Sequence, residues 1–194
     1  MSLRSATISR KTRETSIRCS LDLDGDGSAD VKTGLGFLDH MLTSLARHGG
    51  LRLELVAEGD LEVDDHHTVE DCALVLGEAL EAALGDKSGV VRFGHAYVPL
   101  DEALARAVVD LSGRPWPAVE LGLRRERLGD VACENLTHFF NSLAMRARIT
   151  LHVDVLKGDN DHHRAEAAFK AVAVALRTAV AVRGGGVPST KGVL

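Results

Sequence analysis

The sequence predicts an α/β fold, an α+β sandwich in which one unit of strands and helices occurs twice. Residues 37–46, F-L-D-H-M-L-T-S-L-A, match residues 135–144, N-L-T-H-F-F-N-S-L-A, so that His40 and His138 are in register. The segments D-D-H-H-T-V-E at 64–70 and N-D-H-H-R-A-E at 160–166 form a second matching pair. Apolar residues then recur at helical spacing after each pair of histidines. These observations favour two similar halves, 1–90 and 91–194, in one compact unit.

Each half is expected to contain strands, a short helix, a further strand and a long helix. The segments L-R-L-E-L-V-A and I-T-L-H-V-D-V follow the short helices and alternate as half-buried strands do. The H-H-x-x-E segments open the long helices, with Asp64, Asp65 and Asp161 near the N-cap position and Gly85 and Gly184 as stop signals. Helices are therefore expected to cover one face of each of two mostly antiparallel sheets.

Two further segments concern the strands. Alternation around residues 91–98 and 104–111 predicts a β-hairpin. D-L-D-G-D-G at residues 22–27 begins like an EF-hand loop, but Thr33 stands at the twelfth position, where a bidentate glutamate is needed. The segment is therefore expected to form a tight hairpin turn instead of a calcium site.

The composition restricts the class of protein. A hydrophobic fraction of 45% is sufficient for a folded core, and a net charge of −5 argues against binding to duplex DNA. No apolar run approaches the length of a transmembrane helix. The Arg- and Ser-rich residues 1–15 are expected to be mature protein instead of a targeting peptide. Three cysteines without C-x-x-C spacing favour a reducing compartment, and we expect the cytoplasm.

Histidines and glutamates are spaced for binding two metal ions. His66 and Glu70 share a helix face, as do His162 and Glu166, whereas adjacent histidines point about 100° apart. Each long helix should therefore serve two ions. An approximate twofold axis between the halves would group the residues into two sets, the first of His66, Glu70 and His163, the second of His162, Glu166 and His67. The simplest arrangement adds His138 to the first set and His40 to the second, and the reverse stays open. Imidazole and carboxylate ligands suit several transition metals and do not select one.

Other polar residues are candidates for an anion site. Ser189, Thr190 and Lys191 follow glycines at the C-terminus and could hold a phosphate. Lys170 lies four residues after Glu166 and so shares its helix face. Arg92 and Arg114 border predicted strands and are by spacing alone surface cations. Three further histidines are weaker candidates. A structural role and a site role are about equally expected for His48. His95 is expected to be structural, and His152 is expected to be exposed.

Several motifs together resemble the imidazoleglycerol-phosphate dehydratase family. They are G-F-L-D-H-M-L, G-D-L-E-V-D-D-H-H-T-V-E-D, R-F-G, P-L-D-E-A-L, D-L-S-G-R-P, H-F-F, D-H-H-R-A-E-A-A-F-K-A and P-S-T-K-G-V-L, and they extend from about Arg10 to Leu194. The resemblance implies removal of water from imidazole glycerol phosphate to give imidazole acetol phosphate, in histidine biosynthesis. It also implies two Mn²⁺ ions per active site and a homo-oligomeric shell of 24 subunits, with the active sites between subunits. Neither nucleic acid nor membrane is an expected partner.

The resemblance also implies roles for individual residues. The metal ligands would be His40, His66, His67, Glu70, His138, His162, His163 and Glu166. Phosphate contacts would be Arg92, Arg114, Lys170, Ser189 and Lys191, with Thr190 beside them. Substrate contacts would also include Glu14, His40, His48, His66, His67, Glu70 and His162, and the candidates for proton transfer are Glu14, Glu70 and Glu166. The chain departs from the family pattern at Ser44, where glutamine is common, and at Thr137, where glutamate is common.

Two other functions are compatible with the ligands. A dinuclear hydrolase of phosphate esters would use the two metals to activate water. A metal-storage protein would need the metal ligands but not the cations Arg92, Arg114, Lys170 and Lys191. Incubation with substrate distinguishes the three functions by phosphate release, an acetol product or no turnover.

Overall fold

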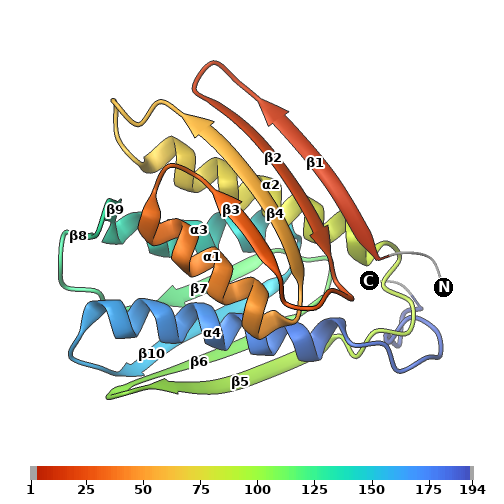
Figure 1. Cartoon of the computed structure of the whole chain (residues 1–194). Helices are drawn as coiled ribbons and strands as arrows, with labels where there is room; N and C mark the ends of the chain where they lie inside the picture. Colours follow the sequence, from red (N-terminus) through yellow and green to blue (C-terminus); the bar gives the residue numbers. More distant parts are fainter. Residues whose placement is uncertain (1–3, 193–194) are drawn as a thin grey trace.

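The computed structural model describes residues 4–192, which form two sheets with helices between them (Figure 1). The elements in the first half are β1 (Ser5–Lys11), β2 (Thr15–Asp22), β3 (Ala29–Lys32), α1 (Gly36–Gly49), β4 (Arg52–Gly59) and α2 (His66–Leu84). Those in the second half are β5 (Phe93–Leu100), β6 (Ala103–Asp110), β7 (Trp116–Glu120), β8 (Arg127–Leu128), β9 (Val131–Ala132), α3 (Cys133–Arg146), β10 (Thr150–Lys157) and α4 (Asp161–Val180). Apart from the short pair β8–β9, the two halves have the same order of elements, as the internal repeat predicts.

The two large sheets have the same strand order. The first is β1-β2-β4-β3 and the second is β5-β6-β10-β7. In each sheet the last strand pairs in parallel and the other pairings are antiparallel. The hairpin predicted around residues 91–111 is formed by β5 and β6. The mixed fold with mostly antiparallel sheets is therefore confirmed.

The prediction of a tight hairpin turn at residues 22–27 is wrong. The strands on either side of this segment, β2 and β3, do not pair with each other, because β4 lies between them in the sheet. The segment carries the chain across the end of β4, where Leu53 donates its backbone N–H to the carbonyl of Ser28. β3 can then run parallel to β4.

The helices form the middle layer and exchange partners between the halves (Figure 1). The long helix α2 packs on β1 and β2, and the long helix α4 packs on β5 and β6. The short helix α1 lies against α4, and the short helix α3 lies against α2. Each short helix thus contacts the long helix of the other half. One continuous hydrophobic core joins both halves.

Small residues bring α4 close to its sheet. A Cβ atom added to Gly94 on β5 would lie 1.9 Å from the carbonyl oxygen of Ala175 on α4, which is far inside van der Waals contact. Ala105 and Ala107 on β6 are completely buried beneath the same helix. These small residues allow α4 to pack closely on β5 and β6.

The ends of the long helices differ in part from the prediction. Asp64 accepts the backbone N–H of His66, and Asn160, not Asp161, accepts that of His162. The buried Asp161 instead accepts the backbone N–H groups of Arg124 and Arg125. Gly85 ends α2 as predicted, whereas α4 ends at Val180, before Gly184.

Candidate metal centre

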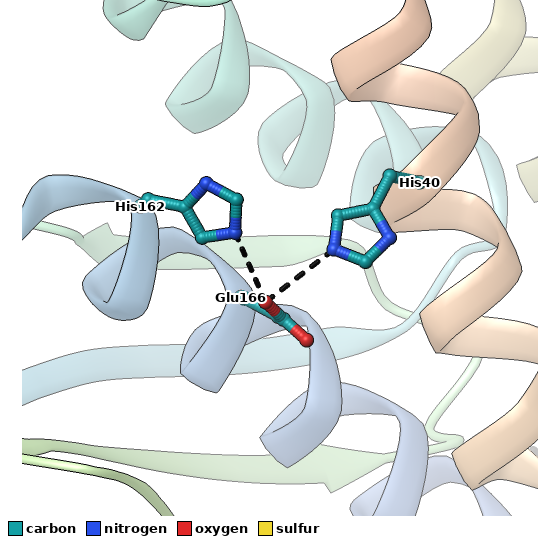
Figure 2. A group of neighbouring side chains, drawn as sticks. All are labelled: His40, His162 and Glu166. Atoms are coloured by element: carbon teal, nitrogen blue, oxygen red, sulfur yellow. Dashed lines mark hydrogen bonds and ion pairs between the residues drawn. The ribbon is translucent and has the colours of Figure 1, made fainter.

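The first cluster of candidate ligands lies where α1 meets α4. His40 projects from α1, and His162 and Glu166 project from the first turns of α4 (Figure 2). The Nε2 atoms of His40 and His162 lie 3.4 and 3.2 Å from the same oxygen, Oε2 of Glu166. The three side chains converge on one point and are half-buried or exposed, so that point can be reached from solvent.

The second cluster repeats this arrangement where α3 meets α2. His138 on α3 lies with its Nε2 atom 2.9 Å from Oε1 of Glu70 on α2. His66, one turn before Glu70, stacks on His138 with ring centroids 4.9 Å apart. The Nδ1 atom of His66 faces Oδ1 of Asn135 at 2.9 Å, which leaves Nε2 free. The two clusters therefore contain the same set of side chains, two histidines and one glutamate.

The geometry of both clusters fits one cation each. The candidate donor atoms within each cluster lie within 4.8 Å of one another. Donors that share an ion at about 2.1 Å lie roughly 3–4 Å apart, so only small side-chain adjustments are needed. The grouping of His138 with the first long helix and His40 with the second is the simpler of the two arrangements considered. It follows from the exchange of helix partners between the halves.

The second histidine of each adjacent pair points away from its cluster. The rings of His66 and His67 are 6.1 Å apart and nearly perpendicular, and the same holds for His162 and His163. This is the divergence expected for neighbours on a helix. Within residues 4–192 of a single chain, neither His67 nor His163 joins the three ligands of either cluster.

A carboxylate holds each of these outlying histidines. The Nδ1 atom of His67 lies 3.1 Å from Oδ2 of Asp60, and this hydrogen bond raises the pKa of His67. The Nδ1 atom of His163 lies 2.8 Å from Oε2 of Glu102, which raises the pKa of His163 in the same way. Hydrogen bonds from the backbone N–H of Asn160 and from His163 lower the pKa of Glu102 to about 2.

Lys170 makes the two clusters electrostatically different. Its Nζ atom lies 2.8 Å from Oε1 of Glu166, the oxygen that does not face the histidines. Burial raises the pKa of Glu166, but Lys170 and His40 outweigh this effect and hold the pKa below its ordinary value. Burial and the nearby charge of Lys170 lower the pKa of His48. The carboxylate of Glu166 is therefore ionised and partly neutralised at neutral pH.

The candidate phosphate contacts do not gather around one cluster in this chain. The guanidinium of Arg92 donates to Asp110 and to the carbonyl of Pro188, which anchors the C-terminal segment that carries Ser189. The backbone N–H of Arg92 bonds to Ala179, near the end of α4. Thirteen helical residues separate Glu166 from Ala179, or roughly 20 Å at 1.5 Å per residue. A single phosphate could not contact both ends of α4 at once.

The other candidate residues occupy varied environments. Thr190, Lys191 and Arg114 are exposed, and the guanidinium of Arg114 contacts the carbonyl of Ser112. Glu14 is exposed in the turn between β1 and β2, and its negative charge acts on His67. Ser44 and Thr137, the two departures from the family pattern, are buried and half-buried.

Sequence reasoning missed three residues that contact the candidate ligands. Asn135 and Glu102 lie 69 and 61 residues from the histidines they contact, so that no spacing links them. Asp60 lies seven residues before His67, beyond the local spacing of a helix. Its position directly after a strand and before the first H-H pair was the one available signal.

Within the described part of the chain, no helix is long and apolar enough to cross a membrane.

Comparison with known proteins gives one consistent family. The sequence profile of imidazoleglycerol-phosphate dehydratase matches residues 33–176. The imidazoleglycerol-phosphate dehydratase of Methanothermobacter thermautotrophicus is 56% identical over 194 residues, which is the full length of both chains. That of Phytophthora nicotianae is 61% identical over 193 residues, and the match covers 99% of this chain but 43% of the longer relative.

Solved structures give the same result. The crystal structure of imidazoleglycerol-phosphate dehydratase from Staphylococcus aureus superposes with a TM-score of 0.83 at 39% identity, covering 92% of this chain and 99% of that one. The enzyme from Pyrococcus furiosus gives a TM-score of 0.83 at 38% identity, covering 96% and 100%. Since the profile, the relatives and the folds agree over most of the chain, it belongs to the imidazoleglycerol-phosphate dehydratase family.

Proposed function

We propose that the protein removes water from imidazole glycerol phosphate to give imidazole acetol phosphate, a step of histidine biosynthesis. The observation that carries the proposal is the pair of matching clusters, His40 with His162 and Glu166, and His138 with His66 and Glu70. Two equivalent His-His-Glu clusters can hold two metal ions, one for each nitrogen of the substrate's imidazole ring.

We further propose that each cluster holds one Mn²⁺ ion. Two imidazoles and one carboxylate form a mixed donor set that suits a borderline metal and tolerates Mn²⁺. The three donors leave coordination positions for further ligands and substrate. When bound, the ions would supply Lewis-acid charge that stabilises negative charge developing on the substrate.

Other roles in the reaction, namely ligand orientation, phosphate binding and proton transfer, would fall to individual side chains. Glu166 and Glu70 orient the imidazoles beside them and neutralise the cations. Lys170 places a positive charge beside one cluster, where a phosphate or another anionic group of the substrate can bind. The exposed carboxylate of Glu14 can accept or donate a proton near His67. The C-terminal segment anchored by Arg92 brings Ser189 and Lys191 to the phosphate.

The active site is proposed to form between subunits of a homo-oligomer, with 24 subunits as the expected number. Two observations support this arrangement. His67 and His163 lie outside the clusters of their own chain. Arg92 lies against Ala179, near the end of α4, whereas Glu166 and the other ligands of the cluster lie near the start of that helix. A neighbouring subunit that supplies the missing histidine and the phosphate contacts would complete each site.

The cytoplasm is the proposed location. All three cysteines are buried free thiols, which suits a reducing compartment.

Turnover of the purified protein tests the function. Imidazole glycerol phosphate is incubated with protein loaded with Mn²⁺ and with protein treated with a chelator. We expect the acetol product only with the metal. Release of inorganic phosphate would favour a metallohydrolase, and metal binding without turnover would favour storage.

The variant Arg92→Ala tests the anion site. It should lower kcat/KM roughly tenfold or more while the metal content stays the same.

A further inference from the structure

The outlying histidines, His67 and His163, share a feature that their positions in the repeat do not explain. In both, Nδ1 faces a carboxylate oxygen, Asp60 for His67 and Glu102 for His163. The two carboxylates are not equivalent in the duplicated halves. Asp60 follows β4 of the first half, whereas Glu102 lies in the turn between β5 and β6 of the second. The same contact between histidine and carboxylate is thus supplied by different elements in the two halves.

A carboxylate at Nδ1 determines which ring nitrogen can bind a metal. An ionised carboxylate only accepts hydrogen bonds, so a neutral imidazole beside it carries its proton on Nδ1. The lone pair is then on Nε2, the other ring nitrogen. Oδ2 of Asp101 lies 3.8 Å from Nε2 of His163, which is too far for a hydrogen bond, so Asp101 does not occupy this nitrogen.

His66 shows the same principle within a cluster. Oδ1 of Asn135 faces Nδ1 of His66, while the amide nitrogen of Asn135 donates to the buried Asp65. This second bond fixes the orientation of the amide, so Nδ1 of His66 must donate and Nε2 is left for the cluster. Oxygen acceptors therefore hold Nδ1 in three of the six candidate histidine ligands.

We propose that Asp60 and Glu102 are positioning residues, which hold His67 and His163 with Nε2 available to a metal site of a neighbouring subunit. The inference rests on the proposed metal-dependent function. Asp60 and Glu102 would act on the metal through the histidines that they contact. Partners of this kind typically change metal affinity 10- to 100-fold when they are removed.

The hydrogen bonds of Glu102 and Asp60 make a sharp experiment possible. Oε1 of Glu102 accepts the backbone N–H groups of Asp159 and Asn160, and Oε2 faces His163. In Glu102→Gln the amide oxygen must stay with the two backbone donors, so the amide nitrogen faces Nδ1. That nitrogen donates a hydrogen bond, which forces the imidazole proton onto Nε2 and blocks it as a ligand.

Asp60→Asn removes the same charge with a different result. Both oxygens of Asp60 lie near Nδ1 of His67, at 3.2 and 3.1 Å. The asparagine can therefore turn its oxygen toward the ring and keep Nε2 free. Asp60→Ala removes the acceptor altogether. Glu62→Gln is the matched control, since Glu62 is an exposed carboxylate two residues away.

The assay is titration of metal-free protein with Mn²⁺, with the free ion measured by electron paramagnetic resonance. We expect two ions per wild-type chain. Glu102→Gln and Asp60→Ala should each weaken binding at least tenfold at one of the two sites. Asp60→Asn should change it less than threefold, and the control should not change. Imidazole ¹⁵N shifts of the metal-free protein should show the Nε2-protonated form of His163 only in Glu102→Gln.

Each outcome decides a different question. Wild-type protein that binds no Mn²⁺ would overturn the proposed metal-dependent function. Two ions in the wild type, with equal affinities in Glu102→Gln and Asp60→Asn, would overturn only the positioning role. Thermal unfolding of the metal-free variants checks folding. If Glu102→Gln does not fold, the comparison of Asp60→Ala with Asp60→Asn decides, and equal affinities in that pair contradict the proposal.

Discussion

Lys170 breaks the symmetry between the two clusters, and its replacement by methionine tests how much this matters. The ammonium lies 2.8 Å from Glu166, one helical turn away. In the first half the residue four positions after Glu70 is Leu74, which carries no charge. Methionine keeps the length of the lysine stem and removes the positive charge beside one cluster only.

The magnitude follows from the geometry. A divalent ion on Oε2 of Glu166 would lie about 5 Å from Nζ of Lys170, where the repulsion is about 1.7 kcal/mol even with the dielectric constant of water. The side chains of Lys170 and Glu166 are only 17% and 14% exposed, so screening is incomplete. Because about 1.4 kcal/mol corresponds to a tenfold change, Lys170→Met should tighten one metal site tenfold or more. Substrate binding should weaken, since an anionic group loses its partner.

Titration with Mn²⁺ resolves the two sites and measures the change. Arg177→Met is the matched control, because Arg177 is an exposed cation further along α4. KM for imidazole glycerol phosphate should rise roughly tenfold in Lys170→Met and stay constant in the control. Weaker or unchanged metal binding in Lys170→Met would refute the electrostatic reasoning.

Other predictions concern stability and assembly. Asp65→Ala should cost about 3 kcal/mol of unfolding free energy in urea titrations, because a buried carboxylate that binds Asn135 is lost; a cost below about 1 kcal/mol would contradict this. Burial raises the pKa of the Cys19 thiol to about 12, so above pH 9 the unfolded chain loses a proton that the folded chain keeps. Stability should then fall by up to about 1.4 kcal/mol per pH unit, less steeply in Cys19→Ala. Gly94→Ala should lower Tm by several degrees, since its Cβ would collide with the carbonyl of Ala175, whereas an unchanged Tm would mean that α4 can move outward. A chelator should dissociate the oligomer in light scattering, and an intact particle would argue against sites between subunits.

The repeat in the sequence was sufficient to predict most of the fold. Hydrophobic periodicity identified α2, α4, β4 and β10, because each presents one regular face to a continuous core. It could not predict the path of residues 22–27. Asp and Gly residues fit a tight hairpin and a longer crossing loop equally well, and strand pairing decides between them. The end of α4 was also misplaced, since the helix stops at Val180 without glycine.

The candidate site was predictable where it depended on helical spacing. His66 with Glu70 and His162 with Glu166 face the same way because four residues make about one turn. The carboxylate partners of the outlying histidines were not predictable. Glu102 reaches His163 across 61 residues, and only the packing of the β5–β6 turn against the start of α4 brings them together.

The exchange of short helices between the halves has a consequence for the ancestry of the protein. Each cluster takes its single histidine from one half and its histidine–glutamate pair from the other. A half-length ancestor would therefore have had one incomplete set of ligands by itself, but a symmetric pair of such chains would have built two identical clusters. Fusion kept both clusters in one polypeptide and freed the copies to diverge. Lys170 opposite Leu74, and Asp60 and Glu102 at unrelated positions, are differences that an identical pair of chains could not acquire.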